Sequence, residues 1–261
     1  MTNLHTHSTF CDGKDTPEDM VLAAIDRGFD VLGFSSHAML PEALDFTLDE
    51  DKARRYAAEV RALAEKYADR IEIRLGVEAD FIPPSILPDR SRYAFIAPDY
   101  IIGSIHFVIA PDGIRVPVDH ALPLLAEGIE KHFGGDGEVV VRAYLAALRD
   151  MVAHNDFDIV GHPDLYRKFN GRLRFFDESA PWYRDELVRT ADALAASGKT
   201  VEINTGGIAR GWMDDAYPSA FFRALLRERG VRMILSSDAH SAAAIDCSFD
   251  RFAGEVSTRN G

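Results

Sequence analysis

Two pairs of potential metal ligands lie near opposite ends of the chain, each with its members two residues apart. His5 and His7 form one pair, and Asp238 and His240 form the other. Alternate residues of a β-strand point to the same side, so the two imidazoles of the first pair could share one ion. An H-x-H pair alone is a weak signal, and its ordinary alternative is two chance histidines near a terminus. Whether this pair binds a metal must therefore be judged from the other candidate ligands in the sequence.

Further candidate ligands stand where short apolar runs end: His37 after residues 31–34, Glu78 after 71–77, His106 after 100–105 and His162 after 157–161. A carboxylate such as Glu78 at the end of a buried strand needs a partner, because burying a free charge is costly. That partner could be a pair of metal ions or an arginine. Asp12 precedes Gly13, which by itself indicates an ordinary surface turn, but beside His5 and His7 it becomes a candidate carboxylate ligand.

Taken together, these residues indicate a metal centre. Six of the nine histidines fall at or just past a predicted strand end, whereas His120, His132 and His154 fall in helical or loop stretches and have an ordinary interpretation. Nitrogen and oxygen ligands without thiolates suit Zn, Mn or Fe. The ligands are too many for one ion, so we expect two or three. Paired ions typically clamp the attacking and leaving oxygens in phosphoryl transfer. Asp164, just beyond His162, could orient a ligating histidine.

The elements that must position these residues alternate between strand and helix. The predicted strands are 2–7, 31–34, 71–77, 100–105, 157–161, 200–203 and 231–235, and the predicted helices are 16–27, 48–68, 120–132, 139–155, 180–197 and 219–229. This alternation predicts an α/β fold with a parallel sheet, either a closed barrel or an open doubly wound sheet. In a barrel the strand ends converge, and active sites lie at the C-terminal ends.

Composition limits the kinds of partner. The formal net charge of −13 argues against a general nucleic-acid binder, although arginines and metal ions could still hold a phosphate. Two cysteines favour a reducing compartment. We find no signal peptide and no run long and apolar enough to span a membrane, so we expect a cytoplasmic enzyme without a membrane partner. The 261 residues suit a single domain, 1–261.

The ordered motifs resemble those of the PHP (polymerase and histidinol phosphatase) superfamily. They are His5-Thr6-His7-Ser8, Asp12-Gly13, Ser36-His37, Gly76-Val77-Glu78, Gly103-Ser104-Ile105-His106, Gly161-His162-Pro163-Asp164 and Ser237-Asp238-Ala239-His240. Within it, the chain is similar to the monofunctional histidinol-phosphate phosphatases. That likeness rests on the length, on residues 33–37, on 161–165 followed by Arg167-Lys168, and on 202–207 followed by Arg210.

The resemblance implies a distorted TIM-like (β/α)7 barrel and three metal sites. It assigns His5, His7, Glu78 and Asp238 to the first ion, Glu78, His106 and His162 to the second, and Asp12, His37 and His240 to the third. Asn3 departs from the family pattern, since many relatives have Asp there. Asp12 stands where some branches have His, which puts the third site in doubt.

The implied activity is hydrolysis of L-histidinol phosphate, a small-molecule phosphate ester of histidine biosynthesis, by a hydroxide that bridges two ions. Glu78, Asp238 and His240 are the expected catalytic residues. Arg167 and Arg210, with Lys168 a weaker third, are the expected phosphate-binding residues, because guanidinium groups suit phosphate. The alternative interpretation of each of these three residues is an ordinary solvated surface charge. The stretch 110–136 could cover the substrate.

Other functions stay open at this point. A PHP phosphoesterase acting on another small phosphate ester, on nucleotides, or as a 3′–5′ exonuclease shares the same motifs. An amidohydrolase-type barrel also opens with H-x-H, but it usually has eight strands and a carboxylated lysine where this chain has Glu78. A non-catalytic metal-binding protein would keep the ligands without a substrate-binding group. The sequence does not indicate the oligomeric state.

Overall fold

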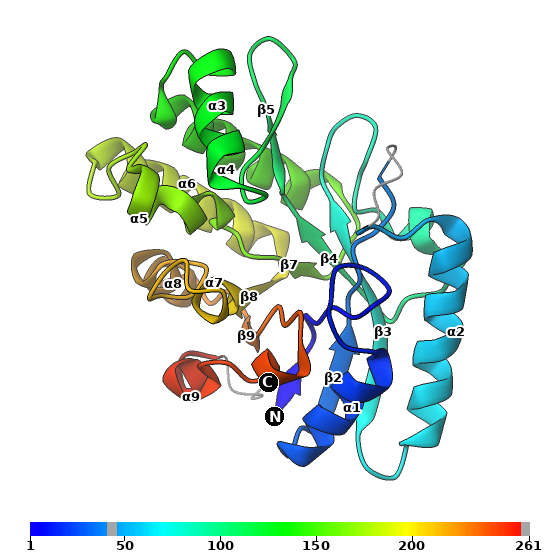
Figure 1. Cartoon of the computed structure of the whole chain (residues 1–261). Helices are drawn as coiled ribbons and strands as arrows, with labels where there is room; N and C mark the ends of the chain where they lie inside the picture. The colour runs from blue at the N-terminus through cyan, green and yellow to red at the C-terminus, as the bar shows by residue number, and fades with distance from the viewer. Residues whose placement is uncertain (41–45, 257–261) are drawn as a thin grey trace.

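Seven parallel strands form one sheet in the computed structural model, which describes residues 1–40 and 46–256. In spatial order they are β1 (Thr2–Asn3), β2 (Val31–Phe34), β3 (Glu72–Asp80), β4 (Tyr100–Ser104), β7 (Ile159–Val160), β8 (Thr200–Asn204) and β9 (Met233–Ser236). The two edges approach each other beyond β1, where the amide of His7 donates to the carbonyl of Ala239 at 2.9 Å. The sheet is therefore a nearly closed barrel, and this confirms the predicted fold (Figure 1).

Most of the main helices lie outside the sheet and connect successive strands: α1 (Pro17–Asp26), α2 (Glu50–Lys66), α4 (Gly137–His154), α6 (Pro181–Ser197) and α8 (Ala220–Glu228). The remaining one, α3 (Leu122–His132), lies beside the strand β6 (Arg115–Pro117). Their starts follow from local chemistry. Thr16 and Asp19 form a capping box at α1, with Pro17 in its first turn. Asp49 and Ser219 cap α2 and α8 by accepting backbone N–H groups. The predicted helices agree to within a few residues.

The structure corrects three details of the predicted elements. The strand expected over 71–77 continues to Asp80, so Glu78 lies within β3 rather than after it. The strand expected over 2–7 has only two residues in the ladder, because residues beyond Asn3 make a single bridge, from Thr6 to Ala239. An antiparallel hairpin of β5 (Phe107–Ile109) and β6 (Arg115–Pro117) was not predicted. Its tight turn at Pro111-Asp112-Gly113 uses the positive φ of Gly113.

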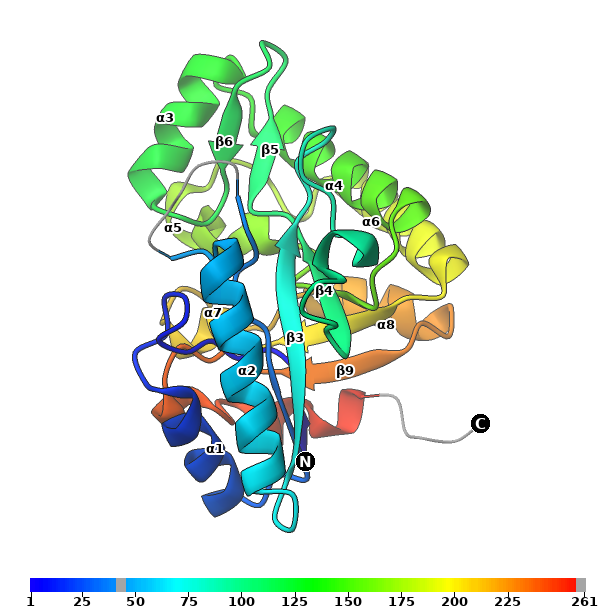
Figure 2. The same cartoon turned by 90° about the vertical axis from the view of Figure 1, so that its right-hand side faces the viewer.

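The hairpin and α3 stand beyond the C-terminal ends of β3 and β4 (Figure 2). We refer to residues 107–132 as the lobe. Shorter elements complete the described chain: η1 (Arg90–Tyr93), η2 (Leu165–Phe169), α5 (Asn170–Leu173), α7 (Gly206–Ala209), η3 (Ala242–Ala244), α9 (Phe249–Phe252) and η4 (Ala253–Glu255). Among the described helices, none is both long and apolar enough to cross a membrane. The predicted single domain, 1–261, includes residues 41–45 and 257–261, which lie outside the described residues.

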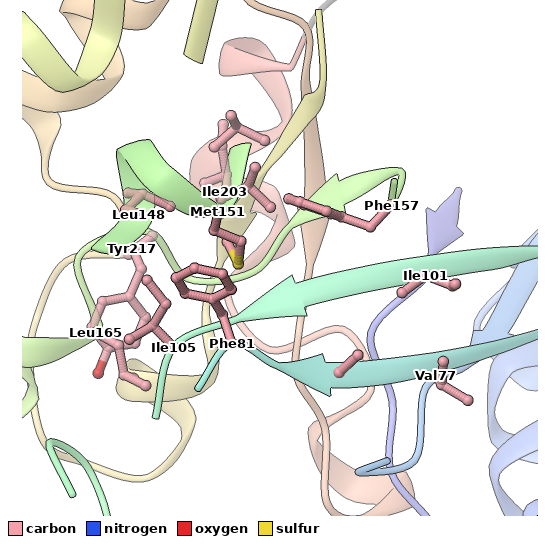
Figure 3. Packing of buried hydrophobic residues seen from close by; sticks show 14 of the residues in the cluster. Val77, Phe81, Ile101, Ile105, Leu148, Met151, Phe157, Leu165, Ile203 and Tyr217 are labelled. Carbon is pink, nitrogen blue, oxygen red and sulfur yellow. The ribbon is translucent and has the colours of Figure 1, made fainter. Parts of the chain in front are cut away.

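The main core lies between the sheet and the helices around it. Figure 3 shows part of it, where Val77 and Ile101 lie on neighbouring strands and Leu148, Met151 and Ile203 pack further along. Such burial contributes about 25 cal/mol per Å² of apolar surface and makes the barrel a rigid support for the residues at its rim.

Tyr100 fills part of the barrel interior. Its hydroxyl donates to the carbonyl oxygen of Leu4 at 2.6 Å, and it lies 3.0 Å from that of Phe34. The ring fits because Gly33 and Gly76 have no side chain: a Cβ on either glycine would lie 2.3 Å from the phenol of Tyr100. Buried side chains of Leu4, Ile102 and Ile159 form one small cluster with it. The barrel is therefore packed at this level and has no open bore.

Candidate metal centre

Glu78 lies at the centre of the histidines that the strand ends bring together. Its Oε2 atom lies 3.3 Å from Nε2 of His5, 3.6 Å from Nε2 of His7 and 3.0 Å from Nδ1 of His37. Its Oε1 atom lies 3.4 Å from Nε2 of His106 and 2.8 Å from Nε2 of His162. One buried carboxylate thus faces five imidazoles, which suits a carboxylate shared between metal ions.

Asp238, Asp12 and His240 extend this cluster to one side. Oδ1 of Asp238 lies 3.2 Å from Nε2 of His7 and 3.7 Å from Nε2 of His5. Nε2 of His240 lies 3.0 Å from Oδ2 of Asp12. The backbone of Asp238 has a φ of +48°, a strained conformation for a residue with a side chain, and such strain is often found at functional sites.

Four overlapping groups have ligand atoms within 4.8 Å of one another: His7, Asp12, His37 and His240; His5, His7 and Asp238; His5, Glu78 and His162; and His37, Glu78 and His106. All nine predicted ligands occur in these groups. Nε2 of His5, Nε2 of His7 and Oε2 of Glu78 are buried without a hydrogen-bond partner. Buried polar atoms are nearly always satisfied, so these three converging atoms fit a bound cation.

The charges of this cluster perturb one another. Burial raises the pKa of Glu78, but the charges of His5, His37 and His106 outweigh it and hold that pKa well below its usual value. Burial lowers the pKa of His7, but Cys11 and Asp238 outweigh it and raise that pKa to about 10. The carboxylates therefore attract positive charge, which protons or metal ions can supply in competition.

Arg210 and Lys168 line a polar cavity of about 180 Å³ beside the cluster, together with Glu78, Asp238 and His240. The guanidinium of Arg210 lies 3.1 Å from Oδ1 of Asp238 and 2.9 Å from Nδ1 of His240. The side chain of Lys168 donates to the backbone carbonyl of Asp119 at 2.7 Å. The cavity thus combines the ligand cluster with two cationic groups.

Arg167, the other predicted phosphate-binding residue, is not among the residues that line this cavity. Its side chain is 11% exposed, donates to Glu178 at 2.9 Å and lies 3.5 Å from Asp164. Asp164 in turn accepts the amide of Ser219 at 2.7 Å, so it holds the start of α8 rather than a ligating histidine. Arg167 and Lys168 are adjacent in η2, but their side chains point in different directions: Lys168 lines the cavity, and Arg167 forms an ion pair with Glu178.

Comparison with known proteins agrees with this geometry. Residues 3–206 match the family called PHP domain. The chain belongs to this family. A Deinococcus radiodurans protein named "Probable histidinol-phosphatase" is 30% identical to this PHP chain over 94% of the chain and 88% of the relative.

Two solved structures share the fold of this PHP chain. The hisK protein of Listeria monocytogenes is 22% identical and superposes with a TM-score of 0.87, covering 97% of this chain and all of the other. Histidinol phosphate phosphatase from Lactococcus lactis, solved in complex with zinc, L-histidinol and phosphate, is 23% identical. It superposes with a TM-score of 0.69 over 97% of this chain and 93% of its own.

The PHP site also contains residues that sequence reasoning missed. Oε2 of Glu202, on β8, lies 2.9 Å from Nδ1 of His5, and Oδ1 of Asp80 lies 2.8 Å from Nδ1 of His106. Asp80 could have been found, because it stands two residues after Glu78 and shares its face of the strand. The hydroxyl of Ser104 donates to Oε1 of Glu78 at 2.8 Å. Carboxylates that hold the far nitrogen of a ligating histidine fix its orientation and its tautomer.

The lobe brings another histidine to the site. His120 had an ordinary interpretation from sequence, yet it lines both the polar cavity and an adjoining cavity of about 510 Å³. His132 and His154 match expectation, since each pairs with an aspartate at a surface position. The sequence could not reveal the position of His120, because nothing in a loop's residues indicates which cavity the loop will line.

Proposed function

We propose that the chain is a metal-dependent phosphatase that hydrolyses L-histidinol phosphate to L-histidinol and phosphate, the reaction used in histidine biosynthesis. The observation that carries this is the cluster of Glu78 with eight further candidate nitrogen and oxygen ligands, beside a cavity with Arg210 and Lys168. The D. radiodurans relative and the L. lactis complex support the substrate. We infer that the chain acts as one catalytic domain in the cytoplasm.

Two or three divalent ions, Zn, Mn or Fe, are proposed as cofactors. Zinc has the support of the L. lactis complex. His5, His7, Glu78 and Asp238 would hold the first ion, and Asp12, His37 and His240 the third. Glu78, His106 and His162 would hold the second, since Nε2 of His106 and Nε2 of His162 lie 3.4 and 2.8 Å from Oε1 of Glu78. The chemistry supplied at such a centre is a pKa of water lowered to about 7, together with neutralisation of phosphoryl charge.

The protein's own residues position the reactants. Glu202 and Asp80 hold His5 and His106 so that their Nε2 atoms face Glu78. Arg210 and Lys168 would bind the phosphoryl oxygens, with Arg210 also in contact with Asp238. Phosphoryl transfer depends mainly on positioning and charge stabilisation, so this arrangement provides what the reaction requires.

The decisive experiment is phosphate release from L-histidinol phosphate by the purified protein, before and after chelation and after metal is restored. Other phosphomonoesters, nucleotides and single-stranded oligonucleotides serve as comparison substrates. We expect chelator-sensitive hydrolysis with the highest kcat/KM for L-histidinol phosphate. Metal-dependent hydrolysis confined to other esters or to oligonucleotides would assign the chain to a different PHP phosphoesterase activity.

A further inference from the structure

Two cavities adjoin at the mouth of the barrel and differ in character. The polar cavity lies against the ligand cluster, whereas the larger one of about 510 Å³ is bordered by Leu40, Phe46, Phe107 and Pro117. We refer to the larger one as the apolar cavity. Asp119 and His120 line both, so the lobe supplies residues at the junction. A substrate with a phosphate at one end and a flat ring at the other could extend across this junction.

L-histidinol phosphate also carries an ammonium group, between the phosphate and the imidazole. A buried cation needs an anionic partner. Of the residues that the structure describes, five carboxylates line the two cavities: Asp12, Glu78, Asp80, Asp119 and Asp238.

Four of these carboxylates are already engaged. Glu78 and Asp238 face the histidine cluster. Asp12 lies 3.0 Å from His240, and Asp80 holds His106 at 2.8 Å. Each therefore has a neighbour that belongs to the proposed metal centre, and a substrate cation would have to compete with it.

Asp119 differs from these four. Among the described residues, its carboxylate has one ion-pair partner, Nζ of Lys168 at 3.5 Å, which is beyond a normal charged hydrogen bond. The charges of His106, His162 and Arg210 also act on it, from beyond ion-pair distance. Lys168 donates instead to the backbone carbonyl of Asp119 at 2.7 Å. The carboxylate is partly exposed to the cavities and retains acceptor capacity. Within the described part of the chain, it is thus the cavity carboxylate best placed to accept a cation from a ligand.

We propose that Asp119 binds the ammonium group of the substrate and that the apolar cavity receives its imidazole, which makes Asp119 a specificity-determining residue. This rests on the proposed function and deepens it. The phosphate would then lie with Arg210 and Lys168, and the ammonium with the carboxylate at the junction. The site would favour phosphate esters of amino alcohols over esters that lack the amine.

The test compares two substrates that differ only in the amine: L-histidinol phosphate and 3-(imidazol-4-yl)propyl phosphate. Asp119→Asn keeps the backbone carbonyl that holds Lys168, so phosphate binding should persist. Loss of a charged hydrogen bond should lower kcat/KM for the amine substrate about 10- to 100-fold and leave that of the amine-free ester within about threefold. Asp119→Glu, which keeps the charge, should retain part of the preference.

Glu127→Gln is the matched control, since it removes one negative charge from an exposed position on α3 of the same lobe and should change neither substrate. Thermal melting of each variant checks folding. An equal loss on both substrates, or no loss on either, would overturn the role of Asp119. If the wild-type protein hydrolyses neither ester, the proposed function itself fails, and this result is distinct from the preceding ones.

Discussion

Glu202 offers a sharp test of how the metal centre is held together. It is fully buried on β8, and its Oε2 atom accepts from Nδ1 of His5 at 2.9 Å. Its Oε1 atom accepts the amide of His162 at 2.7 Å and the side-chain amide of Asn204 at 2.8 Å. With Nδ1 protonated, Nε2 of His5 presents a lone pair toward Glu78. Glu202→Gln would place an amide donor opposite Nδ1 and favour the opposite tautomer.

The expected magnitude follows from this geometry. A glutamine can keep its carbonyl oxygen toward the amides of His162 and Asn204, so the fold should persist. Its NH₂ group then faces His5, whose Nε2 becomes protonated and can no longer bind a cation. Loss of such a supporting carboxylate typically weakens metal affinity 10- to 100-fold, or about 1.4–2.7 kcal/mol.

The assay is zinc binding by competition with a chromophoric chelator, with phosphatase activity measured across the same zinc range. Excess zinc should restore much of the activity of Glu202→Gln. Glu186→Gln is the control, because Glu186 is also a buried glutamate but pairs with Arg142 and Arg149 away from the site. It should lose stability without losing zinc affinity. Wild-type zinc affinity in Glu202→Gln would refute the positioning role.

Three further outcomes follow. The double variant His5→Ala/His7→Ala should lose bound metal and phosphatase activity yet keep its circular dichroism spectrum, and full activity would refute the metal assignment. Arg210→Ala should raise KM for L-histidinol phosphate about 10- to 100-fold, as loss of a charge-assisted hydrogen bond implies, with metal content measured in parallel; an unchanged KM would remove Arg210 from phosphate binding. The pKa values of His5, His7, His37 and His106 are raised above 6.5 in the metal-free protein, because the charges of nearby acidic groups outweigh burial. The stability that these protonated histidines contribute to the metal-free protein is complete below about pH 6.5 and is lost as pH rises through the folded-state pKa values. Adding metal should therefore raise Tm more at pH 9 than at pH 6.5. A difference in Tm between metal-bound and metal-free protein that becomes smaller with rising pH would contradict this.

The sequence predicted which candidate ligands cluster better than it predicted the residues that support them. The candidate ligands could be found because parallel strands end at one rim, which makes a strand-end histidine informative. Glu202 carries no such sign, since its role depends on the distance between β8 and His5 across the barrel. Arg167 and Lys168 are neighbours in sequence, and the 3₁₀ turn alone decides that Lys168 lines the cavity. His120 depends on how a hairpin folds over the rim, which no local pattern specifies.

Tyr100 fills the barrel interior beneath the ligand cluster, and its phenol packs directly against Gly33 and Gly76. In the described part of the chain, the two cavities beside the centre lie against the lobe residues Asp119 and His120, so we expect substrate to enter and both products to leave on this side. The phosphate product would occupy the inner, polar cavity, and the amino alcohol would occupy the outer one. Release should therefore be ordered, with the alcohol leaving before phosphate. Inorganic phosphate would then compete with the substrate, whereas L-histidinol would show noncompetitive product inhibition.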